Sequence, residues 1–253
     1  MFGRPRLRGE PTSRNGASSF HLRWLVDGPV DAVRVTLEVV QPPVVDRLYF
    51  WALQASFADR GRRLGGAHLG LQHHPAHPGD AAVNFGGYAS TGGQLRGTGS
   101  ALPSARDNPN TRDYLWHPGR RYRLAIGPGS EPGAWAGTVT DLETGDETLV
   151  RELLPGGTEL ITPMVWSEVF ARCEHPSASV RWSDPGIRTG GTWHPVEAAS
   201  VSYQTKADGG CDNTSAATDE VGLVQTTAVE RRVRPGDVLT WPGAPARPSA
   251  GSG

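Results

Sequence analysis

Apolar and polar residues alternate with a period of two along most of the chain between residues 20 and 241. Residues 34–39 (Arg-Val-Thr-Leu-Glu-Val) alternate strictly, which is typical of a half-buried β-strand. Residues 48–57 are apolar on both faces, as in a central strand. Further strands are predicted at 64–73, 121–126, 134–141, 146–152, 163–172, 178–183, 197–204 and 222–234. Because no segment carries an extended helical stripe, the pattern predicts an all-β fold, an antiparallel two-sheet jelly-roll sandwich.

Turn-forming residues separate the predicted strands. Residues 143–146 (Glu-Thr-Gly-Asp) are a hairpin signal between two alternating segments. Residues 174–177 (Glu-His-Pro-Ser) are expected to form a similar turn between the strands on either side of them. The stretch 88–114 is rich in Gly, Ser, Asn and Pro, so it is expected to be a long loop that is either functional or disordered.

Both ends of the chain differ in composition from the alternating region. Residues 1–19 and 242–253 are too poor in apolar residues to form a core of their own. We therefore expect a disordered tail at each end and a single β-sandwich domain at 20–241.

The charge balance weighs against nucleic acid as a partner. The chain of 253 residues has 25 Lys and Arg against 26 Asp and Glu, a net charge of −1. A nucleic-acid-binding surface normally carries a basic stripe, and the short arginine clusters at 60–63, 120–123 and 231–234 are expected to be solvated strand ends. No apolar run is long enough to span a membrane, and residues 1–19 lack the apolar core of a signal peptide. We expect no membrane partner and a cytoplasmic location, unless the N-terminus has been trimmed.

The two cysteines leave two possibilities open. Cys173 and Cys211 could form a disulfide bond, which would stabilise the fold by closing a long loop. Two free, buried thiols are the alternative. The sequence does not distinguish between them, and it does not determine the oligomeric state.

Five segments carry a recognisable combination of motifs: Tyr49-Phe-Trp-Ala-Leu-Gln54, Gly66-Ala-His-Leu-Gly-Leu-Gln72, Asn84-Phe-Gly-Gly-Tyr88, Trp166-Ser-Glu-Val-Phe170 and Gly209-Gly-Cys-Asp-Asn-Thr214. Together they resemble an uncharacterised bacterial family of actinobacterial type, related to the concanavalin A-like lectins and glucanases. The resemblance covers most of residues 20–235 and implies a concanavalin A-like sandwich. It points to carbohydrate only by analogy of fold, and it supplies no catalytic residues, because the family has no settled activity.

The alternation also predicts which polar side chains share a sheet face. His68 and Gln72 fall on one face of their strand, and Trp166 and Glu168 share a face of theirs. If these faces coincide, they form a groove in which amides and a carboxylate bind sugar hydroxyls while an indole stacks on the sugar ring. We therefore predict a poly- or oligosaccharide ligand on one concave sheet face, without a cofactor. The predicted contact residues are Gln54, His68, Gln72, Asn84, Tyr88, Trp166 and Glu168.

Alternative chemistries remain open at the level of sequence. As an enzyme, a hydrolase or lyase, the protein would use Glu168 or His73 as its acid or base. The paired carboxylates of sandwich glucanases (Glu-x-Asp-x-x-Glu) are absent, although Asp184 could approach Glu168 across the predicted turn. These features favour a binding protein over an enzyme. A structural or interaction domain without a small-molecule site is the third alternative.

A histidine-rich stretch raises the question of a metal site. It supplies four imidazoles within a short span: His68, His73, His74 and His77. Zinc sites need three or four ligands at fixed geometry, and this spacing matches no established metal motif. The sequence therefore favours a loop that is rich in histidine, and no metal is predicted.

Overall fold

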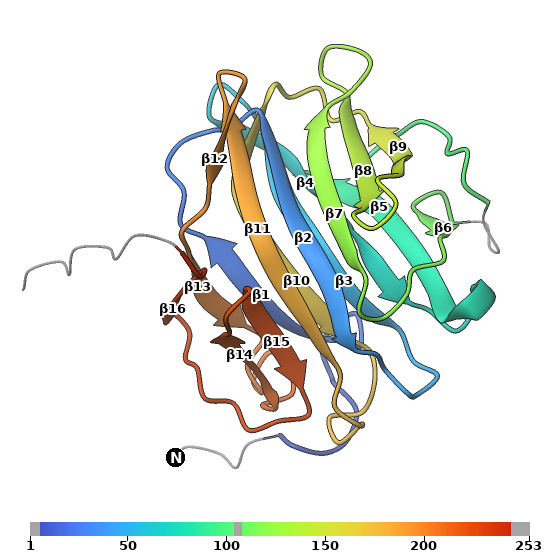
Figure 1. Cartoon of the computed structure of the whole chain (residues 1–253), viewed down its shortest axis with the longest axis vertical. Coiled ribbons are helices and arrows are strands. Elements are labelled where there is room, and N and C mark those ends of the chain that lie inside the picture. The colour runs from blue at the N-terminus through green and yellow to red at the C-terminus, as the bar shows by residue number, and fades with distance from the viewer. Residues whose placement is uncertain (1–5, 104–107, 244–253) are drawn as a thin grey trace, which may run out of the picture.

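Two antiparallel β-sheets pack face to face in the computed structural model, which describes residues 6–103 and 108–243 (Figure 1). Sheet A has the strand order β16-β13-β1-β10-β3-β4-β5-β6, and sheet B has the order β14-β15-β11-β2-β7-β8-β9, with β12 paired to β11. The prediction of an all-β, two-sheet sandwich is confirmed. The outer ends of both predicted tails lie outside the described residues.

The strands of sheet A are β1 (Ser18–Trp24), β3 (Tyr49–Asp59), β4 (Arg62–His73), β5 (Ala81–Ala89), β6 (Thr111–Asp113), β10 (Glu159–Val169), β13 (Ala198–Tyr203) and β16 (Val238–Thr240). Those of sheet B are β2 (Ala32–Gln41), β7 (Arg121–Pro128), β8 (Trp135–Asp141), β9 (Glu147–Leu153), β11 (Ser179–Thr189), β12 (Thr192–Pro195), β14 (Thr214–Thr218) and β15 (Leu223–Thr227). A single 3-10 turn, η1 (Pro78–Asp80), is the only helical element among the described residues, and none there is long and apolar enough to cross a membrane.

The core lies between the two sheets and is built mainly from alternate residues of the longer strands. In β2 the apolar positions of the alternating segment, Val35, Leu37 and Val39, are fully buried. Trp51 of sheet A and Trp182 of sheet B are also among the fully buried side chains. Because a strand turns successive side chains to opposite faces, the other positions form the outer faces of the sandwich.

Two predicted turns have different outcomes. Residues 143–146 connect β8 and β9 as a hairpin, and Gly145 takes the positive φ of 81° that such a turn requires. Residues 174–177 form no hairpin, because β10 belongs to sheet A and β11 to sheet B. The prediction of a hairpin there was wrong: the chain passes from one sheet to the other at this point. A local turn signal marks a change of direction but does not say which strand the chain pairs with next.

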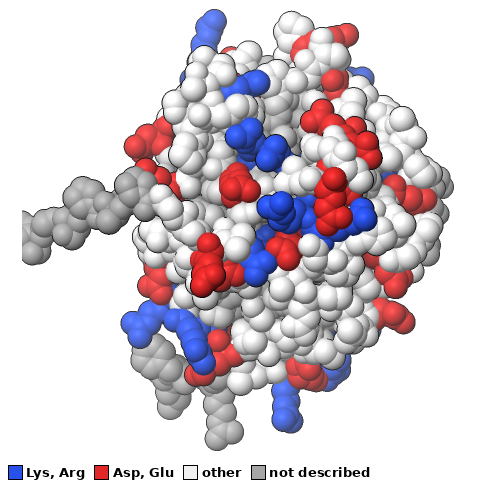
Figure 2. Space-filling view, in the orientation of Figure 1, with Lys and Arg blue, Asp and Glu red and all other residues white. Residues whose placement is uncertain are grey.

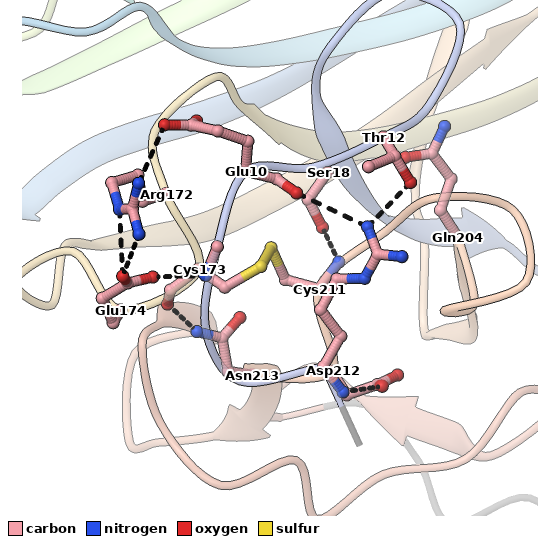
Figure 3. The surroundings of a disulfide bond; sticks show 12 residues. Glu10, Thr12, Ser18, Arg172, Cys173, Glu174, Gln204, Cys211, Asp212 and Asn213 are labelled. Atoms are coloured by element: carbon pink, nitrogen blue, oxygen red, sulfur yellow. Dashed lines mark hydrogen bonds and ion pairs between the residues drawn. A yellow bond between two sulfur atoms is a disulfide. The ribbon is translucent and has the colours of Figure 1, made fainter. Parts of the chain in front are cut away.

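Cys173 and Cys211 form a disulfide bond, with their Cα atoms 5.6 Å apart (Figure 3). Cys173 follows β10 of sheet A, and Cys211 precedes β14 of sheet B. The bond therefore joins two connections between the sheets. Both cysteines are buried.

The N-terminal segment 6–17 crosses the disulfide (Figure 3). Its backbone exchanges hydrogen bonds of 2.8 Å with Cys173 and with Gly209. Strand β1 then begins at Ser18. Residues of the 6–17 segment bind the rest of the chain through their backbone, which a pattern of apolar residues cannot reveal, and the domain boundary at residue 20 stays a prediction.

The outer face of sheet B carries charges of both signs (Figure 2). Arg181 forms ion pairs with Glu38 at 2.6 Å and with Asp219 at 2.8 Å. Close by, the Trp193 ring stacks on the guanidinium of Arg34, 4.2 Å from its centroid. The opposite outer face, on sheet A, carries the residues predicted to bind a ligand.

Candidate ligand-binding site on the outer face of sheet A

The residues predicted to contact a ligand lie on the same face of sheet A. In one cross-strand row Glu168 pairs with Phe50, which pairs with Gln72. In a parallel row Gln54 pairs with His68. Residues that pair directly across strands point to the same face of a sheet. A third row runs from Trp166 through Ala52 and Gly70 to Asn84. A fourth row contains the pair Gly66–Tyr88.

Three rings fill the middle of this face. Phe50 contacts Trp166 and His68 edge-on, with centroids 4.9 and 5.4 Å apart, and together they bury Ala52. The Trp166 side chain is only 6% exposed, and its Nε1–H donates a 2.8 Å hydrogen bond to Gln54 Oε1. The indole therefore orients Gln54, and its ring faces are not open for stacking on a sugar as the sequence led us to expect.

Gln72 and Asn84 are buried beside the three rings. Asn84 Nδ2 donates to Thr111 Oγ1 at 2.8 Å. The side-chain oxygens of Gln72 and Asn84 have no hydrogen-bond partner among the described residues. Both amides lie on the predicted face, but too little of them is exposed to form an open binding surface.

An open hollow of about 420 Å³ lies next to the rings, where β3, β4 and β5 run side by side. Gly65 and Gly66 form its floor, and Gln54, Arg63 and Tyr88 stand around it. Tyr88 is 62% exposed, although it is a large aromatic residue on a strand. Ala89, Ser90 and Gly92 complete the lining. Of the predicted contact residues, Gln54 and Tyr88 are those that line an open space.

Arg63 is the charged residue of the lining, and the sequence pattern did not place it on the face predicted to bind a ligand. Counting by two from His68 along β4 places Arg62, not Arg63, on the outer face. The register shifts at Phe57 and Ala58, so Arg63 pairs with Ala58, which shares its face with Gln54. Leu64 is the extra residue of this bulge and packs against the core. A bulge depends on the pairing with β3, and an alternation pattern in β4 alone does not reveal it.

Among the described residues, the strands next to Glu168 place no second carboxylate beside it in its cross-strand row. Its Oε1 accepts hydrogen bonds from Asn15 Nδ2 at 2.9 Å and from Ser19 Oγ at 3.0 Å. The next carboxylate in its cross-strand row is Asp113, four strand spacings away, or about 19 Å. Paired carboxylates of glycosidases are roughly 5–9.5 Å apart. Asp184 lies on β11 of sheet B, so the expectation that it could approach Glu168 was wrong.

The four clustered histidines are divided between different surroundings. His68 is on the outer face, whereas His73 pairs with Tyr49 on the core side, where its Nε2 lies 3.2 Å from the Val45 carbonyl. His77 binds Asp113 at 2.6 Å. Within the described residues no group of three His, Cys, Asp or Glu side chains is arranged to hold a metal ion. His73 and Glu168 also point to opposite faces of sheet A, so they share no site.

Two histidines of the outer face are held in the neutral form. Burial lowers the pKa of the His68 imidazole from 6.5 to about 4. Burial, together with the charge of Arg23, lowers the pKa of His21 to about 4 as well. Both rings contact Trp166, with centroids 5.8 and 6.4 Å from the indole.

We expect the free energy of unfolding to decrease as the pH falls from about 6.5 to about 4. In this range the unfolded chain binds protons at His21 and His68 that the folded chain excludes, so acid favours unfolding. Urea unfolding at several pH values measures the slope of the free energy of unfolding against pH. The double variant His21→Gln/His68→Gln should flatten it, whereas His194→Gln, which changes an exposed histidine of β12, should not. An unchanged slope in the double variant would contradict the assignment of this pH dependence to His21 and His68.

A larger hollow of about 800 Å³ lies beside the disulfide, and none of the residues predicted to bind a ligand lines it. Its most prominent cation, Arg231, donates to the carbonyls of Thr214 and Cys211 and stacks on Tyr203 at 3.7 Å. It also pairs with Asp212. The hydrogen bonds and the ion pair of the Arg231 guanidinium are therefore formed within the protein. For this reason we favour the smaller hollow on sheet A, where Gln54, Arg63 and Tyr88 are open to a ligand, as the binding site.

No protein-family model and no curated protein matches this chain. Among solved structures it is similar to scytalido-glutamic peptidase bound to a transition-state analogue, at 11% identity and a TM-score of 0.49, covering 83% of this chain and 98% of the peptidase. It is also similar to tailspike protein 2 of an Escherichia coli O157:H7 bacteriophage, CAB120, at 13% identity and a TM-score of 0.34, covering 67% and 22%. A basic winged bean lectin in complex with Tn-antigen matches at 13% identity and a TM-score of 0.22, covering 62% and 73%. The family named from the sequence stays a prediction.

Proposed function

We propose that this protein binds carbohydrate in the hollow between β3, β4 and β5. The observation that carries the proposal is the exposed ring of Tyr88 beside a floor of two glycines. An aromatic ring next to a flat, open floor suits the apolar face of a sugar ring, because the two surfaces exclude water from each other.

The polar groups around the hollow complement the ring. Trp166 binds Gln54 Oε1, which leaves the Gln54 NH₂ group as a donor at the wall of the hollow. Tyr88 adds a hydroxyl that donates and accepts, and Ser90 adds another. Sugar hydroxyls both donate and accept hydrogen bonds, so this set matches them.

The enzyme alternative has less support. Glu168 lacks a nearby carboxylate in its row, and His73 lies on the other side of the sheet. General acid–base hydrolysis of a glycoside needs two groups on either side of one bond. Binding without turnover is the function that this arrangement supports best.

Binding should be measured with a panel of soluble neutral and acidic polysaccharides by affinity electrophoresis, with an assay for released sugar in parallel. We expect retardation by at least one polysaccharide without release of sugar. Tyr88→Ala should weaken binding about tenfold, because it removes a ring contact and a hydrogen bond together worth about 1.4 kcal/mol. Gly66→Ala should act similarly by adding a methyl group to the floor of the hollow: its Cβ would meet no heavy atom closer than 3.5 Å, so the fold has room for it.

The control is Leu149→Ala, which removes an exposed apolar side chain from β9 in sheet B. It should leave the retardation unchanged. Equal retardation of the wild-type protein and both hollow variants would place the binding elsewhere. Release of sugar that depends on Glu168 would favour the enzyme instead.

A further inference from the structure

The lining of the hollow carries positive charge but no negative charge. Arg63 is the only ionised side chain of its lining, and the other lining residues are uncharged. None of the ion pairs found among the described residues includes Arg63. Glu159 lies in the same cross-strand row, two strand spacings from Arg63, or about 10 Å. This spacing is between backbone positions, and the two side chains form no ion pair with each other.

The position of Arg63 is set by the fold. The bulge opposite Phe57 and Ala58 turns Arg63 to the outer face, beside Gly66. A guanidinium nitrogen of Arg63 lies 3.5 Å from the point where a Cβ on Gly66 would be. The guanidinium thus borders the same glycine floor that the Tyr88 ring borders.

Two of the four polar side chains around the floor, Arg63 and Gln54, present hydrogen-bond donors to it. The Arg63 guanidinium donates only, and the Gln54 amide presents its NH₂ group because its oxygen is bound to Trp166. A planar guanidinium binds a carboxylate through two parallel hydrogen bonds. A ligand that fits this set has acceptor oxygens with negative charge next to a ring with an apolar face.

We propose that the carbohydrate bound in this hollow is an acidic sugar, a hexuronate whose ring carboxylate pairs with Arg63 while its ring lies against Tyr88. This inference rests on the proposed function and specifies its ligand class. A sugar sulfate would also present a negative charge to Arg63, but with tetrahedral geometry. The test therefore includes a sulfated polysaccharide.

The test is titration calorimetry of the full chain with trigalacturonate, with its methyl ester, and with dextran sulfate and dextran. Trigalacturonate should bind at least about tenfold more tightly than the methyl ester, which keeps the same rings without the charge. Arg63→Gln should remove this preference, and Arg62→Gln should keep it. Both variants lose one positive charge from adjacent positions of β4, but Arg62 pairs with Asp59 and points to the opposite face.

The outcomes separate this inference from the proposed function. Equal affinities for the acid and the ester, with binding still weakened in Tyr88→Ala, would overturn the hexuronate and leave the sugar site standing. A preference for dextran sulfate over trigalacturonate that Arg63→Gln abolishes would overturn the carboxylate in favour of the sulfate. An acid preference that persists in Arg63→Gln would overturn the role of Arg63. Absence of binding to every saccharide, acidic and neutral, would retire the proposed function and this inference with it.

Discussion

Reduction of the Cys173–Cys211 disulfide is expected to lower the free energy of unfolding by about 4 kcal/mol. The bond closes a loop across a sequence separation of 38 residues, and a cross-link of that length removes much conformational freedom from the unfolded chain. Guanidinium chloride unfolding with and without a dithiol reductant measures the difference. The midpoint should fall, and unfolding should expose more surface, since the unfolded chain becomes more expanded.

The matched control is the double variant Cys173→Ser/Cys211→Ser, whose stability should equal that of the reduced protein and should not respond to the reductant. The reduced protein should also lose protection from hydrogen exchange at the amides of Cys173 and Thr12, which bind the N-terminal segment to the domain at 2.8 Å. An unchanged midpoint, in a sample whose thiols are shown to be free, would contradict the prediction.

Replacement of Trp182 by alanine is expected to cost about 3–5 kcal/mol of folding free energy. The indole is fully buried between the sheets, and its Nε1–H donates to Gln225 Oε1 at 2.9 Å. Gln225 in turn donates to the Phe20 carbonyl of β1 at 3.2 Å, so the pair links sheet B to sheet A. The substitution leaves a cavity and a buried amide oxygen without its donor.

Two further variants separate these contributions in urea unfolding. Trp182→Phe keeps most of the ring and loses the donor, so it should cost about 1–3 kcal/mol. Trp193→Ala removes a partly exposed indole that stacks on Arg34 at 4.2 Å, and it should cost only about 0.5–1 kcal/mol. A cost for Trp182→Ala no greater than that for Trp193→Ala would show that the inter-sheet core is not where the stability resides.

Prediction from the sequence succeeded where a signal is local. The alternation in residues 34–39 identified a half-buried strand, and β2 (Ala32–Gln41) contains it. The glycine of the 143–146 turn identified a hairpin, because few other residues adopt its positive φ. For the candidate site, the two-residue period placed His68 with Gln72, and Trp166 with Glu168, on shared faces, as the cross-strand pairs have them.

Prediction was incomplete where a long-range contact decides the outcome. Trp166 was expected to offer its ring to a ligand, but Phe50 and His68 cover it. Tyr88 was predicted to contact a ligand but was assigned to the start of the loop 88–114; the structure places it on β5, where its side chain is exposed. Burial on an outer face depends on the side chains of neighbouring strands, which are distant in sequence.

The sequence by itself determined the fold class and the set of side chains that share a face, because steric alternation along a strand is a property of consecutive residues. Only the tertiary structure decided which strands are neighbours, that the turn after β10 leads into the other sheet, and that Cys173 meets Cys211. It also decided, through the bulge between β3 and β4, that Arg63 borders the hollow. These features depend on pairing between segments far apart in the chain, and that pairing is selected by the packing of the whole core.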